Sequence, residues 1–174
     1  MTEKKKFFDK KTVTLMLVST LLIIVGMLVC FGLHEGSHYV TLVACNGVAT
    51  EVSMGMESYV AGYIAPQHIT IVALSSLLIP LVFSLATIWI KNMYFNFVAL
   101  GFSVTNLING FLGIAAFVLI DDKATKLTFD IPLAVEYAQN QTGIFLFAVL
   151  CVVFCSACVG YSGEKVKRAL ENYV

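Results

Sequence analysis

This chain has 174 residues, of which 59% are hydrophobic and 13% are charged, and its formal net charge is zero. Ordinary soluble domains carry about 25% charged residues. This chain has too few charges to cover its surface for contact with water, so much of the surface of the folded protein must face lipid. The balanced charge argues against a nucleic-acid partner, because binding to phosphates needs a basic field.

Four apolar runs predict an all-α integral membrane protein, a bundle of four transmembrane helices that forms a single domain over residues 1–174. A helix needs ~20 residues to cross ~30 Å of hydrocarbon, and open strands in lipid would leave backbone groups without partners. The predicted helices cover about 13–45, 68–90, 93–120 and 143–161, with a cytoplasmic tail at 162–174. Residues 46–67 alternate around several glycines, which predicts a short β-hairpin after the first helix.

The basic residues are placed unevenly along the chain. Nine fall before the first predicted helix, between the second and third, or after the fourth, whereas only Lys123 and Lys126 fall in the other two connections. Basic residues gather on the cytoplasmic side of a membrane. We therefore expect a multi-pass protein surrounded by membrane lipid, with both termini cytoplasmic.

Two histidines and a glutamate stand near the outer end of the first predicted helix, in the sequence His34-Glu35-Gly36-Ser37-His38. Helical residues four apart share a face, so both imidazoles can bind one metal ion. Glu35 lies one step round the helix, where it can act as general base in a zinc hydrolase. Ionisable residues at membrane depth are costly and indicate a functional site. The alternative is that these are ordinary interfacial residues at a helix end.

A catalytic zinc usually has three protein ligands and one open position, so a third ligand is needed. The first and third predicted helices both run outward, which brings the end of the third to the depth of the two histidines. Asp122 is therefore the preferred third ligand, with Asp121 as the alternative and Asp130 in reserve. His68, at the start of the second helix, could replace an aspartate. Solvated interfacial side chains are the competing interpretation of Asp121, Asp122 and His68.

Asn106 and Asn109 lie three residues apart within the third predicted helix. In lipid their amides should point into the bundle, where they can hydrogen-bond to the metal ligands or to the backbone of a substrate. Helix packing, aided by Gly110 and Gly113, explains the same residues equally well.

These features resemble the site-2 protease family of intramembrane zinc metalloproteases. The likeness lies in the HExxH helix, in the segment Cys45-Asn46-Gly47-Val48 that follows it, and in Thr105-Asn106-Leu107-Ile108-Asn109-Gly110. It implies a zinc endopeptidase that cleaves membrane-spanning or membrane-near peptides, and a hairpin whose edge strand receives the substrate. The chain departs from the family's usual Leu-Asp-Gly, since Asn109-Gly110 stands where Asp-Gly is expected.

Two other functions stay open at this stage. One is a metal-binding membrane protein without proteolysis, such as a sensor or a transporter, and the other is a family member that has lost catalysis. A transporter needs a polar path through the bundle, whereas the histidines and acids cluster toward one end. The function that the sequence favours is zinc-dependent peptide hydrolysis with Glu35 as the base.

Overall fold

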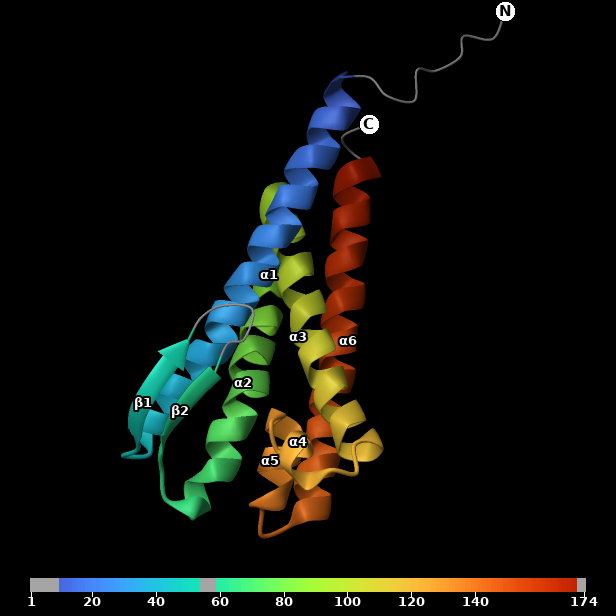
Figure 1. Cartoon of the computed structure of the whole chain (residues 1–174). Coiled ribbons are helices and arrows are strands. Elements are labelled where there is room, and N and C mark those ends of the chain that lie inside the picture. Colours follow the sequence, from blue (N-terminus) through green and yellow to red (C-terminus); the bar gives the residue numbers. More distant parts are fainter. Residues whose placement is uncertain (1–9, 54–58, 172–174) are drawn as a thin grey trace, which may run out of the picture.

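The structure, a computed structural model, describes residues 10–53 and 59–171 (Figure 1). Its elements are α1 (Lys10–Ala44), β1 (Val48–Ser53), β2 (Tyr59–Tyr63), α2 (Pro66–Ala86), the 3-10 turn η1 (Thr87–Trp89), α3 (Met93–Leu119), α4 (Lys123–Lys126), α5 (Asp130–Glu136) and α6 (Gln141–Glu171). Four helices, namely α1, α2 with η1, α3 and α6, are long and apolar enough to cross a membrane. The predicted all-α bundle of a multi-pass membrane protein is confirmed.

The long helices begin and end close to their predicted bounds, but two segments differ from the prediction. The connection predicted at 121–142 contains two short helices, α4 and α5, and the predicted tail begins inside α6, which continues without a break to Glu171. Ion pairs one turn apart, Arg168–Glu164 and Lys167–Glu171, favour this helical extension.

The predicted hairpin is present, because β1 and β2 pair as antiparallel strands. Its direction is set where α1 ends. Asn46 adopts a left-handed conformation with φ 58°, and the amides of Asn46 and Gly47 bond back to the carbonyls of Val43 and Leu42. Two backward bonds of this kind end a helix sharply. The hairpin therefore folds back along α1, which contacts both strands (Figure 1).

A pair of glycines marks the place where α1 packs on α3. A methyl group on Gly26 would lie 2.0 Å from the Val98 carbonyl oxygen, and one on Gly101 would lie 2.1 Å from the Ile23 carbonyl oxygen. Two helix backbones can approach this closely only where side chains are minimal. The position of α1 in the bundle is thus fixed by direct contact between backbones.

The short helix α5 lies inside the bundle rather than on its surface. Ile131, Ala134 and Val135 are at most 3% exposed, and α5 packs against both α2 and α6. The hydroxyl of Thr70 on α2 donates a hydrogen bond to the Ala134 carbonyl. Figure 1 shows α4 and α5 folded back at the end of the bundle opposite both termini. This packing places Asp130, the first residue of α5, between α1 and α2.

Replacing Gly26 with alanine should lower the thermal stability of the purified protein in detergent. The added methyl group would force α1 away from α3, and overpacking of a close contact costs about 1–3 kcal/mol. The measurement is the midpoint of thermal unfolding. Gly160→Ala in α6 is the matched control, because a methyl group there meets nothing within 4 Å among the described residues. Equal midpoints for the two variants would contradict the glycine crossing.

Candidate metal centre

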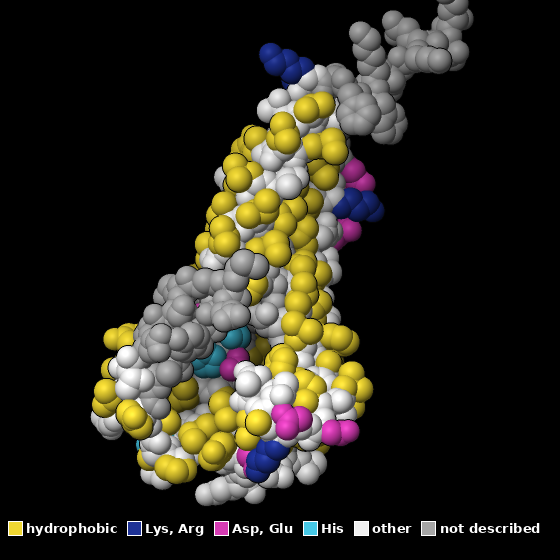
Figure 2. All heavy atoms as spheres, in the orientation of Figure 1, with side chains coloured by type: hydrophobic (Ala, Val, Ile, Leu, Met, Phe, Trp, Pro, Cys, Tyr) yellow, Lys and Arg dark blue, Asp and Glu magenta, His cyan; other side chains and the backbone are white. Residues whose placement is uncertain are grey.

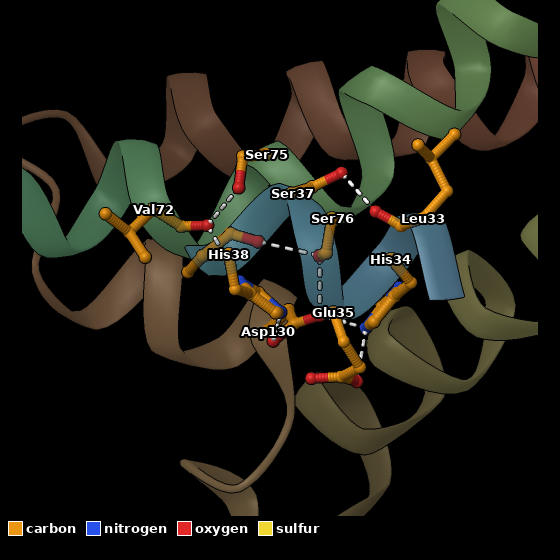
Figure 3. Close-up of polar contacts among 10 residues, drawn as sticks. Leu33, His34, Glu35, Ser37, His38, Val72, Ser75, Ser76 and Asp130 are labelled. Atoms are coloured by element: carbon orange, nitrogen blue, oxygen red, sulfur yellow. Dashed lines mark hydrogen bonds and ion pairs between the residues drawn. The ribbon is translucent and has the colours of Figure 1, made fainter. Parts of the chain in front are cut away.

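His34 and His38 lie in the last third of α1, one turn apart on one face. Their rings meet edge to face with centroids 5.2 Å apart, and their side chains are only 17% and 12% exposed. That face is turned toward α2 and α5, since His38 contacts both helices. Figure 3 shows both imidazoles directed toward Asp130.

The carboxylate of Asp130 reaches both imidazoles. Its Oδ2 lies 3.1 Å from Nε2 of His34, and its Oδ1 lies 3.2 Å from Nε2 of His38. Each of the three side chains offers one ligand atom, and these atoms all lie within 4.8 Å of one another. Among the side chains that the structure describes, at residues 10–50 and 63–171, this is the one group of three or more such residues close enough to hold a metal ion.

The three side chains lie close enough together to bind one metal ion. Ligand atoms about 2.0–2.1 Å from zinc stand about 3.3 Å apart at the corners of a tetrahedron. Each imidazole nitrogen lies close to that distance from a carboxylate oxygen, although the two imidazoles face different oxygens of Asp130. Two imidazoles and one carboxylate are a donor set that zinc accepts. Three such ligands leave the fourth position open for water or substrate.

The hydrogen bond of His38 to the backbone supports the same interpretation. Its Nδ1 lies 3.0 Å from the carbonyl oxygen of Val72 on α2. A carbonyl can only accept, so Nδ1 carries a proton and Nε2 is the nitrogen directed at the cluster, where it donates to Asp130 and would give up that proton to bind a metal ion. Metal-binding histidines usually hold their second nitrogen in this way. Nδ1 of His34, by contrast, is buried without a hydrogen-bond partner in the described part of the chain.

Asp130 is suited to bind as an anion. Burial by itself favours the neutral acid, but hydrogen bonds from His34 and His38 and the charge on their rings outweigh it and hold the pKa of the carboxyl well below its usual range. The carboxyl is therefore ionised at neutral pH, which is the form that binds a metal ion.

Glu35 lies beside the cluster but is not one of its members. It is 6% exposed, its Oε1 lies 3.8 Å from Nε2 of His34, and its Oε2 is buried with no hydrogen-bond partner among the described residues. A buried carboxylate oxygen without a partner is costly, and such exceptions call for an explanation, often a catalytic role or a missing water or ion. Glu35 thus presents a free acceptor next to the donor cluster.

The cluster and Glu35 line a cavity of about 1290 Å³ whose walls are mostly apolar. Asn106 and Asn109 of α3 line the same cavity. The amide of Asn106 donates to Sγ of Cys155 at 3.3 Å, while its Oδ1 is buried without a partner among the described residues. Figure 2 shows histidine atoms next to acidic atoms in a hollow of the surface, beside the end formed by α4 and α5. The cavity is therefore reached from outside.

The structure places the other candidate ligands away from the histidines. Asp122 precedes α4 as its N-cap, and its side chain accepts from the backbone amide of Thr125. Hydrogen bonds from the side chain and then the backbone of Thr125 lower the pKa of this exposed carboxyl. Asp121 is also exposed, and His68 lies in the first turn of α2, outside the cluster. The preference for Asp122 rested on the depth at which α3 ends. Because the chain then folds back through α5, the acid that contacts the two histidines is Asp130, which was the last of the three candidate aspartates.

Comparison with models of protein families, with curated proteins and with solved structures gives no match to this chain. The interpretation of the site therefore rests on its own geometry and chemistry.

Two contributions from α2 were missed in the sequence analysis. The Val72 carbonyl holds His38, and the hydroxyl of Ser76 donates a 2.6 Å hydrogen bond to Oδ2 of Asp130 (Figure 3). The contact of a backbone carbonyl cannot be predicted from the sequence. The role of Ser76 could have been anticipated, because Ser75-Ser76 are two polar residues in an otherwise apolar run and should face the bundle interior.

Asp130→Asn should strongly reduce zinc binding by the purified protein, whereas Asp122→Asn should not. The first change removes the anionic ligand of the cluster, and the second alters only an exposed cap at the start of α4. Zinc content after gel filtration, measured by elemental analysis, should approach one ion per chain in the wild type and in Asp122→Asn. A lower zinc content in Asp122→Asn than in Asp130→Asn would instead identify Asp122 as the third metal ligand.

Proposed function

We propose that this protein is a membrane-embedded zinc endopeptidase in which His34, His38 and Asp130 hold the metal and Glu35 is the general base. One observation carries the proposal. Three side chains that can bind a metal ion line an apolar cavity with their ligand atoms within 4.8 Å of one another. Beside them lies a buried carboxylate whose second oxygen has no partner among the described residues. A metal store or sensor needs the donors, but it gives no role to the free oxygen of Glu35.

The donors and Glu35 divide the chemistry between them. When bound, zinc would polarise the scissile carbonyl and make a water more acidic. Glu35 accepts one proton from the attacking water at its free oxygen and passes it to the departing amine nitrogen. One water is consumed and one amide bond is broken, so the carboxylate ends in the form in which it began.

The cavity walls favour an apolar peptide as the substrate. Most of the lining side chains are apolar, and in lipid a peptide group must find its hydrogen bonds within the protein. Asn106 offers one such acceptor, since its buried Oδ1 has no partner among the described residues. A membrane-spanning or membrane-near segment, unwound over the few residues that enter the cavity, would meet these requirements.

The likeness to site-2 proteases agrees with this proposal in two features of the chain. HExxH stands on the first long helix, and a hairpin follows directly. In a protease of this kind the hairpin would pair with an extended substrate by adding a strand at its edge. The third ligand would come from α5 rather than from a Leu-Asp-Gly segment of α3.

The distribution of basic residues favours a site near the outer face of the membrane. His34 follows Lys11 by about 35 Å along α1, at 1.5 Å per residue, and a bilayer core is about 30 Å thick. With Lys10 and Lys11 on the cytoplasmic side, the cluster reaches the opposite interface. Both termini would then be cytoplasmic.

Glu35→Gln should abolish peptide hydrolysis while leaving zinc content unchanged. The amide is nearly isosteric but cannot take a proton, and loss of a general base lowers turnover by about 10²–10⁴-fold. The purified protein in detergent is offered a panel of apolar synthetic peptides, and products are identified by mass spectrometry. Glu171→Gln, at the exposed end of α6, is the control and should behave as the wild type.

The results separate the competing functions. Hydrolysis by Glu35→Gln at the wild-type rate would exclude Glu35 as the base. A wild type that binds zinc but cleaves none of the peptides would favour a metal-binding protein without proteolysis.

Cys45, at the end of α1, should react with a membrane-impermeant maleimide added outside intact cells. The other four cysteines are buried, so Cys45→Ser should remove the signal. A cysteine placed at exposed position 171, as Glu171→Cys in the Cys45→Ser background, should react only after the cells are permeabilised. The reverse pattern would invert the proposed orientation.

A further inference from the structure

Ser76 lies in the middle of α2 and is 1% exposed. Its hydroxyl is within hydrogen-bond distance of two acceptors, Oδ2 of Asp130 at 2.6 Å and the carbonyl oxygen of Ala73 at 2.9 Å. A hydroxyl has one proton, so it donates to one acceptor at a time. The carboxylate is both nearer and charged, and charge-assisted bonds are about twice as strong as neutral ones. The hydroxyl of Ser76 therefore donates its hydrogen bond to Oδ2 of Asp130.

The other serines of α2 show that this contact is not what a serine in an apolar helix ordinarily makes. Serine hydroxyls usually bond back to a carbonyl of the preceding turn. Ser75 does so, with its hydroxyl 2.6 Å from the Val72 carbonyl. Ser84 lies two turns beyond Ser76 on the same face and receives a 3.4 Å contact from Ser103. Among the described serines, Ser76 is the one whose hydroxyl is hydrogen-bonded to a member of the group formed by His34, His38 and Asp130.

Asp130 has reason to need such a partner. It is the first residue of a seven-residue helix that follows a loop, so its side chain is not held by neighbouring turns on both sides. Each carboxylate oxygen must face a different imidazole, which fixes the carboxylate plane within narrow limits. An ionised carboxylate accepts about four hydrogen bonds. One bond from Ser76 can therefore fix the plane and still leave lone pairs for a metal.

We propose that Ser76 is a positioning residue that holds Asp130 in the orientation needed to bind zinc together with His34 and His38. The inference rests on the proposed metal site. Together with the Val72 carbonyl, which holds His38, Ser76 makes one turn of α2 the support for two of the three ligands (Figure 3).

The test measures the affinity of the full chain for zinc by competition with a chromogenic chelator, and the absorption spectrum of bound Co²⁺, which reports coordination geometry. Ser76→Ala should bind zinc about 10–100-fold more weakly, the usual effect of removing such a supporting hydrogen bond. Its Co²⁺ spectrum should be altered. Ser84→Ala, an equally buried serine of α2, should match the wild type in both measurements.

A second pair of variants separates the hydroxyl from the space it fills. Ser76→Thr and Ser76→Val add nearly equal volume, but only threonine keeps the hydroxyl. The Ser76→Thr protein should bind zinc at least about 10-fold more tightly than the Ser76→Val protein. The thermal stability of the two zinc-free proteins should be similar. This comparison decides the question even if Ser76→Ala fails to fold.

Wild-type affinity and spectrum in Ser76→Ala, or equal affinity in the threonine and valine variants, would overturn the role of Ser76. In either case a wild type that binds zinc and needs Asp130 would leave the proposed function intact. A wild type that binds no zinc would overturn both.

Discussion

The contact of the Asp130 carboxylate with two imidazoles joins the end of α1 to a short helix that is distant in sequence. Charged groups in an apolar bundle are costly unless they meet partners, and this carboxylate meets two histidines and a serine. The arrangement explains why α5 folds back into the bundle. Its apolar face fills the space between α2 and α6, while its first residue satisfies the polar end of α1.

Helix α2 contacts both sides of this link between α1 and α5. The Val72 carbonyl accepts from His38, and one turn later the Ser76 hydroxyl donates to Asp130. The two bonds run in opposite senses, so α2 supplies an acceptor to the imidazole and a donor to the carboxylate. The imidazole of His38 thereby presents Nε2 to the cluster, and the carboxylate of Asp130 is held facing it.

Two buried side-chain oxygens of the site have no hydrogen-bond partner among the described residues. The free oxygen of Glu35 and the free oxygen of Asn106 both border the same apolar cavity. Native proteins seldom bury acceptors in this state. The proposed reaction uses both, since a water would donate to Glu35 and a peptide amide to Asn106. A purely structural bundle has no use for either.

The sequence by itself determined the membrane class, the four long helices, the hairpin and the shared face of His34 and His38. These features follow from local periodicity and from the length of apolar runs, because lipid forces each segment to satisfy its own backbone. Only the tertiary structure decided which acid completes the cluster. The segment 121–142 is too mixed in composition to reveal α5, and its position depends on packing against α2 and α6. Depth alone favoured Asp122, whereas Asp130 and its partner Ser76 meet because helices far apart in sequence pack together.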